Sequence, residues 1–439
     1  MVPQLAESLE IPDPRHYRVR LRPGLRFADG SPLDAEDVIA TYRSIVDPGL
    51  RSRYAATYRR ITQIRALDER TLEFELQETH APFVSDLEFP ILPAEAVGKP
   101  LLSVASLRSS SSGPYRLVRQ NEGLLELEAN PYWQGPKARA PRLRLSVVRD
   151  ENTRALRLLG GRADWMQGGA PPSLLPLFSS RATLEVTSRP GIGITYLAFN
   201  LRDRHLSDPR LRRALALSLD RAALIRWKYA GRATPATSWL PPGHWAHAAN
   251  LQPVPHDLQR ARRLLDEVGG ERTPGQRSPR LSLVLRTSSD RFRVSLARAM
   301  AAMWRRIGVE VEVRPSESAT LVEDLNRGRF SFALADFPEV IEPHLLSWFF
   351  ASDKIPVKGV EGGNRWRYRN PEVDRLLEAG QSSIHRAERR AFYLRLQAIL
   401  AEDLPVLPLW HEDVVAIASE RAAKIGASRD GRFSTWVYP

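Results

Sequence analysis

Apolar residues follow two different periods along the chain, and each period predicts one kind of element. Residues 194–199 form an unbroken run of apolar and β-favouring side chains, which predicts a buried strand. Asp208 and Pro209 then supply a capping oxygen and a residue preset for the first helical turn, so a helix begins there. Its apolar residues recur at helical spacing and predict one buried face: Leu211, Ala214, Leu215 and Leu219. Asp220 can cap a second helix.

A regular alternation of strand and helix patterns follows in the second half of the chain. The strand patterns cover residues 281–286, 309–313 and 330–335, and the helix patterns cover 291–307 and 320–326. Strands separated by helices predict right-handed crossovers and a parallel sheet. Ligands of such sheets bind outside the carboxyl ends of the strands. We therefore expect residues 287–289 and 336–339 to form one wall of a binding site.

The two ends of the chain predict further units. Near the front, residues 17–21 and 25–27 predict a hairpin around Pro23 and Gly24, followed by a helix at 35–46 that Asp34 can cap. Two more strands follow, at residues 61–67 and 71–76. The middle of the chain adds strand patterns at residues 115–120 and 124–128. At the other end, helices at 371–384 and 387–403 lead into an apolar strand at 406–410 that continues into 414–418.

Length and charge narrow the class of protein. A chain of 439 residues exceeds what one hydrophobic core usually fills, so two or more domains are expected. No apolar run approaches the length of a membrane span. The net charge of +13 comes from 58 arginines and only six lysines, which are scattered among acidic residues along the whole length. This scatter indicates solvated surfaces rather than a nucleic-acid site.

The residue types that carry most enzyme chemistry are absent or badly placed. The chain has no cysteine, which excludes disulfides, thiolate zinc sites and cysteine nucleophiles. It contains no Walker A, H-E-x-x-H or G-x-S-x-G sequence, and the glycines of Gly191-Ile192-Gly193 precede a strand instead of following one. His244 and His247 lie three residues apart without a third ligand nearby. We expect no catalytic residue, no cofactor and no metal.

Several blocks of sequence, in one order, resemble the family 5 extracellular solute-binding proteins. The front carries YRVRLRPGLRFADGSPLDAEDVIATYRSIVDP, which is similar to the family's L-R-x-G-x-x-F-x-D-G-x-P-x-x-A-x-D-V stretch. SGPYRLVR and NPYWQGPKARAPRLRLSVVRDENTRALRLLGGRADW continue the resemblance. The central block is ITYLAFNLRDRHLSDPRLRRALALSLDRAAL, and the closing blocks are GGNRWRYRNPEVDRLLEAG and RRAFYLRLQAILAEDLPVLPLWHEDVVA. The resemblance covers essentially the whole chain.

The resemblance implies an α/β fold, a two-lobed periplasmic-binding-protein-like clamshell of type II, the peptide-binding class, with an extra small α+β domain. Residues 1–111 would form the small domain, 112–198 the N-terminal lobe completed by 413–439, and 199–412 the C-terminal lobe. The function implied is capture of a peptide or similar small solute and its delivery to a membrane ABC permease. The protein would be an exported monomer, periplasmic or at the cell surface, with no nucleic-acid partner.

The resemblance also implies ligand-binding residues. Phe337 matches the aromatic residue that peptide-binding members place at the end of the third strand, and Glu339 is the nearest match to an acid that anchors a peptide's amino group. Glu342 is the second candidate for that anchor, and Asn364 and Tyr368 match a G-N-x-x-x-Y run. The remaining candidates lie on the crossing strands and on the loop after residue 286: Tyr196, Asn200, Ser288 and Trp410.

The start of the chain departs from the family pattern, and two other functions remain possible. The chain begins close to the L-A-E-S motif without a signal peptide, whereas family members have a further stretch before it, so we expect an unpaired sheet edge in the N-terminal lobe. The same fold could instead report a solute to a regulatory domain, although no helix-turn-helix precedes the clamshell. A glycoside or peptide hydrolase is a third possibility, which the missing catalytic motifs disfavour.

Overall fold

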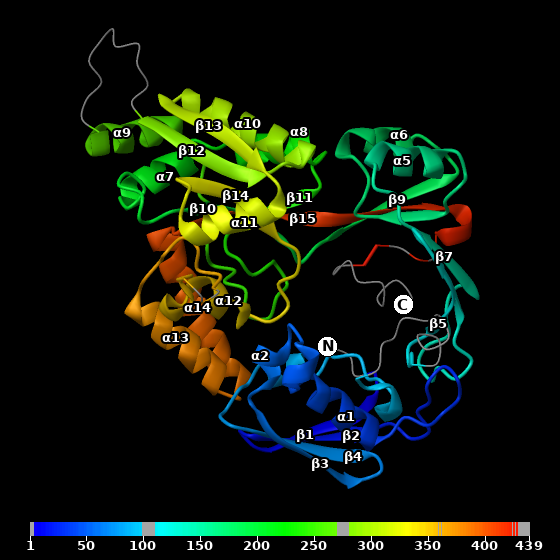
Figure 1. Ribbon diagram of the computed structural model, residues 1–439. Coiled ribbons are helices and arrows are strands. Elements are labelled where there is room, and N and C mark those ends of the chain that lie inside the picture. Colours follow the sequence, from blue (N-terminus) through cyan, green and yellow to red (C-terminus); the bar gives the residue numbers. More distant parts are fainter. Residues whose placement is uncertain are drawn as a thin grey trace.

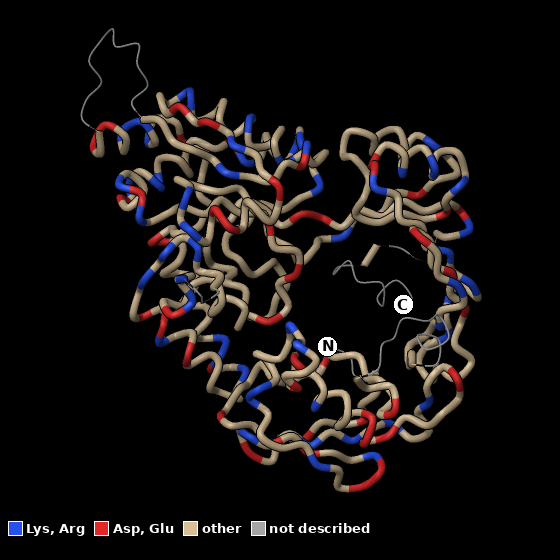
Figure 2. The backbone as a smooth tube through the Cα atoms, viewed as in Figure 1, with Lys and Arg blue, Asp and Glu red and all other residues tan. Residues whose placement is uncertain are grey.

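The computed structural model describes residues 4–98, 110–269, 281–358, 360, 362–423, 425, 427 and 428. Figure 1 shows these residues as three bodies arranged in an open ring. They are a small N-terminal domain, a small lobe and a large lobe. Strand β15 (Val406–Ser419) runs from the large lobe into the small one. Acidic and basic residues are interspersed over all three bodies, as expected from the scattered arginines (Figure 2).

The small N-terminal domain is a four-stranded antiparallel sheet with helices packed on it, in the strand order β1-β2-β4-β3. Its elements are β1 (Ala6–Asp13), β2 (His16–Leu21), α1 (Ala35–Val46), α2 (Ala55–Tyr58), β3 (Ile61–Asp68), β4 (Thr71–Leu76) and α3 (Phe83–Asp86). Asp34 caps α1 as predicted, and its carboxylate accepts hydrogen bonds from the amides of Glu36 and Asp37. Tyr42 of α1 lies edge-on to Phe74 of β4, with 5.2 Å between ring centroids, and this contact joins the helix to the sheet.

The expected hairpin partner of β2 was wrong. Residues 25–27 form no strand and make only an isolated bridge from Arg26 to Pro32, whereas β2 pairs with β1 on one side and β4 on the other. Leu25 and Phe27 are nevertheless buried, so their alternation reflects a loop tucked into the core. Strand β1 was missed because six of its eight residues are exposed, which leaves no apolar period to detect.

The small lobe contains two sheets. A three-stranded meander consists of β5 (Tyr115–Asn121), β6 (Leu124–Ala129) and β7 (Arg142–Ser146). The second layer consists of α5 (Glu151–Leu159), β8 (Trp165–Gln167), α6 (Leu175–Ser179) and β9 (Leu184–Pro190). Strands β8 and β9 both pair with the second half of β15, so the C-terminal strand completes this lobe.

The large lobe is an α/β unit with helices on both faces of one sheet. The strand order in this sheet is β11-β15-β10-β14-β12-β13. Strand β12 runs parallel to both β13 and β14, as predicted. In chain order, the first elements of the lobe are β10 (Ile194–Phe199), α7 (Pro209–Leu217), α8 (Arg221–Lys228), β11 (Ala233–Pro235) and α9 (Leu258–Gly269). They are followed by β12 (Leu281–Ser288), α10 (Arg291–Arg305), β13 (Val309–Ser316), α11 (Ser318–Arg327), β14 (Phe332–Phe337), α12 (Leu345–Phe350), α13 (Pro371–Ser382) and α14 (Arg386–Asp403).

Strand β10 is buried on both faces, which explains why its run of six residues is apolar or aromatic apart from Thr195. Leu197 and Phe199 pack into the core that contains α7 and α10, whereas Tyr196 and Ala198 pack into the core of α12 and α14. The side chains on both faces are buried, which favours apolar residues, and the one polar exception, Thr195, bonds to Glu412 Oε1 at 2.6 Å. Asp208 and Asp220 cap α7 and α8 through their carboxylates, as expected.

The small N-terminal domain contacts the large lobe beside α13 and α14 (Figure 1). The amide of Ala81 donates to the carbonyl of Gln381 at 2.9 Å. His80 and His344 meet edge to face at the same contact, with ring centroids 5.3 Å apart. Burial lowers the pKa of both imidazoles, that of His344 to about 3, so both are neutral at pH 7.

Acid is expected to weaken this contact. In the unfolded chain both histidines bind a proton near their ordinary pKa, whereas the folded protein keeps them neutral, so stability is lost as pH falls below about 6.5. For His344 alone, linkage predicts a loss of about 2 kcal/mol between pH 7 and pH 5. Urea unfolding of the protein and of His344→Gln at both pH values measures it. The variant should lose less stability on acidification, and an identical loss would contradict the assignment.

Candidate functional site

The linker between β9 and β10, one of the two connections between the lobes, packs closely against strand β15, the other connection. Residues 191–193 link β9 to β10, and a Cβ on Gly191 would lie only 2.4 Å from the carbonyl oxygen of Glu412. A Cβ on Gly193 would lie 2.8 Å from the carbonyl oxygen of Pro338, in the loop after β14. Only glycine allows such close approach of two backbones. The two connections therefore lie side by side where the lobes meet.

A buried histidine holds the connection in place. The Nδ1 atom of His411, on β15, lies 2.8 Å from the carbonyl oxygen of Gly193. Burial lowers the pKa of His411 to about 4, so its ring is neutral at pH 7 and Nδ1 donates a hydrogen bond. The strand and the linker therefore behave as one element at this point.

A charged network lies beside this junction and joins four elements of the large lobe. The guanidinium of Arg293, in the first turn of α10, lies 3.1 Å from Asp336 Oδ1 at the end of β14 and 3.5 Å from Glu412 Oε1 on β15. It also donates to Thr195 Oγ1 of β10 at 3.2 Å. The hydroxyl of Tyr229, just after α8, donates to Glu412 Oε1 at 3.0 Å. We call these five side chains the Arg293 network.

Electrostatics favours the charged form of Arg293. Burial alone would lower its pKa, but the carboxylates of Glu412 and Asp336 outweigh that effect and raise the pKa of the guanidinium. Its side chain is only 14% exposed, whereas the carboxylates of Asp336 and Glu412 remain 52% and 37% exposed. The network thus presents two accessible carboxylates supported by one covered cation.

This arrangement can bind a ligand that carries both signs of charge. Exposed carboxylate oxygens at Asp336 and Glu412 can accept hydrogen bonds from an ammonium group. Arg293 has more donors than the contacts described here require, so a ligand carboxylate can exchange with one of its partners. Peptide ends offer those two charges. The network lies at the carboxyl end of β14, where an open α/β sheet places its ligands.

The site residues predicted after β12 and β14 lie at the same end of the sheet as the Arg293 network. Ser288 ends β12, and Phe337 ends β14 directly after Asp336. The ring of Phe337 contacts that of Phe349, with 5.3 Å between centroids. Glu339 is half-buried in the same loop. Pairing of β10 with β14 brings residue 337 opposite Ile194, so this loop lies at the lobe junction.

Glu342 is already engaged by the protein. Its carboxylate forms an ion pair with Arg389 of α14 and lies 3.4 Å from the hydroxyl of Ser85 in the small N-terminal domain. Burial raises the pKa of Glu342, while Arg389 acts in the opposite direction. The contacts of Glu342 thus join the small domain to the large lobe.

Five predicted site residues are buried, and the contacts found for them are within the protein: Tyr196, Asn200, Asn364, Tyr368 and Trp410. The side-chain amide of Asn364 donates to the carbonyls of Ala351 and Tyr368, and the hydroxyl of Tyr368 donates to Asp403. Asn200 donates to two carbonyls in the turn before β14. A ligand role for these five residues stays a prediction.

Sequence reasoning did not single out Arg293, Thr195, Tyr229 or Glu412. A signal existed for two of them, because Arg293 lies in the first turn of the helix after a parallel strand and Glu412 comes two residues after Trp410, where the crossing strand was predicted. Asp336 was included in the expected loop but not as a site residue. The two histidines weighed as metal ligands, His244 and His247, each bond to a backbone carbonyl, that of Ile341 and Leu240.

Within the described ranges, no group of three or more histidine, aspartate or glutamate side chains is arranged to hold a metal ion. Of the helices in those ranges, none combines the length and the apolar character that a membrane crossing requires.

The comparisons with known proteins agree on one family. The model described as "Bacterial extracellular solute-binding proteins, family 5 Middle" matches residues 1–353. Protein XP55 of Streptomyces lividans is 30% identical over 99% of this chain and 80% of its own length. The glutathione-binding protein GsiB of Shigella dysenteriae is 27% identical over 98% of this chain and 84% of its own length.

Solved structures confirm the expected fold. NikA from Brucella suis, crystallised with Fe(III)-EDTA, has a TM-score of 0.88 at 21% identity and covers 99% of this chain and 89% of its own. The oligopeptide-binding protein AppA from Bacillus subtilis, crystallised with a nonapeptide, has a TM-score of 0.77 at 21% identity and covers 99% and 90%. The prediction of a two-lobed α/β clamshell is confirmed.

Proposed function

Because the chain belongs to the family 5 bacterial extracellular solute-binding proteins, the solute-binding components of ABC importers, we propose that its solute is peptide-like and is held beside the Arg293 network. The observation that carries the proposal is the pairing of two accessible carboxylates with a covered guanidinium at the lobe junction. Closure of the lobes on the solute would then signal a membrane permease. Closure follows only if the solute makes contacts in the closed form that the open form lacks.

Several relatives support a peptide as the solute. The names of two of them specify dipeptide or glutathione binding, and a neighbouring structure contains a nonapeptide. The family consists of solute-binding proteins rather than enzymes, so the solute would leave unchanged. The site of action would be outside the cytoplasmic membrane, as in other extracellular or periplasmic members.

Native mass spectrometry of freshly purified protein tests the proposal directly. A co-purified peptide of a few residues is expected, and glutathione and a panel of di- to pentapeptides should include members that raise the melting temperature. Peptides recovered intact after incubation would separate binding from hydrolysis. A co-purified sugar or metal chelate, with no response to any peptide, would overturn the peptide assignment while leaving the family assignment in place.

The loop acid Glu339 remains our candidate for the peptide's amino group. For a peptide that binds, Glu339→Gln is expected to weaken binding by about tenfold to a hundredfold, because a charged hydrogen bond at a ligand site contributes roughly 1.5–3 kcal/mol. Isothermal titration measures the change. The N-acetylated peptide is the matched control, since it should bind equally to both forms. Equal affinity of the free peptide for both forms would reject Glu339 as the anchor.

A further inference from the structure

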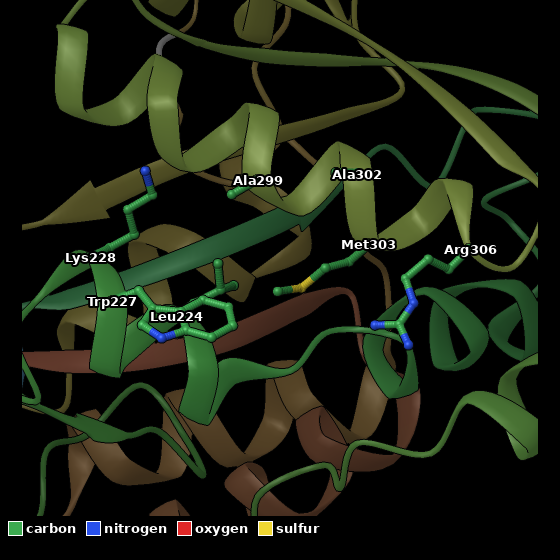
Figure 3. Close-up of a pocket in the computed structure, with 7 residues that line it drawn as sticks. All are labelled: Leu224, Trp227, Lys228, Ala299, Ala302, Met303 and Arg306. Carbon is green, nitrogen blue, oxygen red and sulfur yellow. The ribbon is translucent and has the colours of Figure 1, made fainter.

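Two helices of the large lobe enclose an apolar groove that the solute site does not use. Helices α8 and α10 line it with residues at helical spacing, including Trp227 on α8 and Ala299 and Met303 on α10 (Figure 3). Its volume is about 280 Å³, and Lys228 and Arg306 lie at its rim. The groove contains none of the nine predicted ligand-binding residues.

Trp227 is unusually exposed for its size. The residue is 70% exposed, and the guanidinium of its neighbour Arg226 lies 5.3 Å from the indole centroid. An indole has an apolar body and a polar N–H, so it is most favourably placed where one side is apolar and the other is wet. The exposed ring and the apolar groove beside it therefore form an amphipathic surface that is open to a partner.

The cations around the groove lack opposite charges. Arg226, Lys228, Arg298 and Arg306 form no ion pair with any carboxylate in the described part of the chain, and Lys228 bonds only to the hydroxyl of Ser295 at 2.6 Å. Arg305, on the same helix, shows the contrast, because it pairs with Glu310 at 3.3 Å. The positive charge around the groove is thus available to a partner.

A second groove extends this surface along α10. It is lined by Arg291, Val294, Ser295 and Arg298, together with Ser289 before the helix. On α10, each of these residues has another lining residue three or four positions away, so the linings of the two grooves form one continuous stripe along the helix. Among the residues that the structure describes, none that lines either groove carries a carboxylate. We call this stripe, together with Trp227 and its flanking cations on α8, the α8–α10 surface.

We propose that the α8–α10 surface binds the anionic face of a phospholipid bilayer. Tryptophan beside arginine and lysine matches the layered chemistry of a bilayer surface, with the indole among the glycerol and upper acyl groups and the cations at the phosphates. The small residues Ala299 and Ala302 leave room for methylene groups beside the ring. Four unpaired cations then contribute attraction that salt screens.

Other occupants fit these observations less well. A second copy of the chain would carry the same net charge of +13 and would be repelled. Nucleic acid needs a polar groove that follows its phosphates, whereas the centre of this groove consists of leucine, alanine and methionine side chains. The proposal goes beyond solute capture, since binding to the bilayer would keep the protein near the membrane whatever solute it carries.

Sedimentation with large unilamellar vesicles tests the proposal on the full chain. Vesicles of phosphatidylcholine with 30 mol% phosphatidylglycerol, a composition of about one anionic lipid in three, should pellet the protein, and pure phosphatidylcholine should not. Arg298→Gln combined with Arg306→Gln should lower the partition coefficient about 30-fold, since each basic residue near such a surface contributes about fivefold. Trp227→Ala should lower it about tenfold, with partial recovery in Trp227→Tyr.

The control pair is Arg181→Gln with Arg375→Gln, two exposed arginines in other parts of the molecule. This pair removes the same charge and should leave partitioning unchanged within about twofold. An equal loss in the control pair would show that the diffuse net charge causes binding and would overturn the assignment. Equal pelleting with both vesicle types would also overturn it. So would variants of the α8–α10 surface that weaken binding to single-stranded DNA or to an acidic peptide but leave vesicle binding unchanged.

Discussion

Replacing Arg212 by methionine is expected to lower the free energy of unfolding of the large lobe by about 3 kcal/mol, a loss typical of disrupted buried polar networks. Arg212 lies on α7 and is only 5% exposed. Its guanidinium donates to the carbonyls of Leu206, Ser207 and Leu404 at 2.8–3.0 Å, and also to that of Asp403. Methionine fills a similar volume but leaves these carbonyls without their donor.

The consequence extends to the crossing strand. Leu404 has a left-handed backbone, with φ of 49°, at the point where α14 ends and the chain turns into β15. Such a conformation is costly for leucine and persists only where its surroundings hold it. Arg212 bonds to both carbonyls at this turn, so its loss should also loosen the start of β15.

Arg213 is the matched control for this prediction. It is the next residue on α7, and its guanidinium donates to the carbonyls of Ala401 and Glu402 near the same helix end, at 3.1 and 3.3 Å. It is more exposed than Arg212, so water can replace it and Arg213→Met should cost less than about 1 kcal/mol. Urea unfolding followed by tryptophan fluorescence compares the two. Equal losses would show that burial of the guanidinium is not what matters.

Local chemistry made much of the large lobe predictable. The aspartates at positions 34, 208 and 220 each cap a helix where the sequence placed one, because a cap depends on neighbours only two or three residues away. The parallel strands were also found in advance, since an apolar run followed by a helix pattern encodes a crossover. The apolar run at 406–418 similarly became the continuous strand β15.

The Arg293 network, our proposed solute site, was less accessible to sequence reasoning because its members are far apart in the chain. Thr195 and Arg293 are separated by 98 positions, and Thr195 and Glu412 by 217. No local period relates such residues, and nothing in the sequence distinguishes Arg293 from the other arginines among the 58 of the chain. Only the folded sheet brings β10, β14 and β15 together beside α10.

The family resemblance located shared sequence motifs more readily than it showed what each residue in them does. Asn364 and Tyr368 match a family motif, yet the structure shows them closing a turn on each other, with the amide of Tyr368 donating to Asn364 Oδ1 at 3.0 Å. A buried side chain that satisfies backbone groups produces the same motif as one that contacts a ligand. Burial and partners, which a sequence does not contain, separate the two possibilities.

Replacing Arg293 by methionine is expected to weaken solute binding by about a hundredfold. Removing one member of a buried hydrogen-bonded charge pair typically costs 2–5 kcal/mol, and each 1.4 kcal/mol is a factor of ten. In this protein the change leaves Asp336 and Glu412 without the cation that both of them contact. Isothermal titration with a peptide that raises the melting temperature of the unaltered protein gives the affinity.

Two further substitutions separate charge from geometry in this prediction. Arg293→Lys keeps the charge but replaces a planar fork by a single ammonium, so it should recover only part of the affinity. Arg305→Met removes an exposed arginine from the same helix and should leave affinity unchanged, because its partner Glu310 lies outside the network. Small-angle scattering should show the lobes closing on the solute in the Arg305 variant and closing incompletely in the Arg293 variant at the same solute concentration. Full affinity in Arg293→Met would place the solute elsewhere on the lobe junction, since the network would then be a structural feature only.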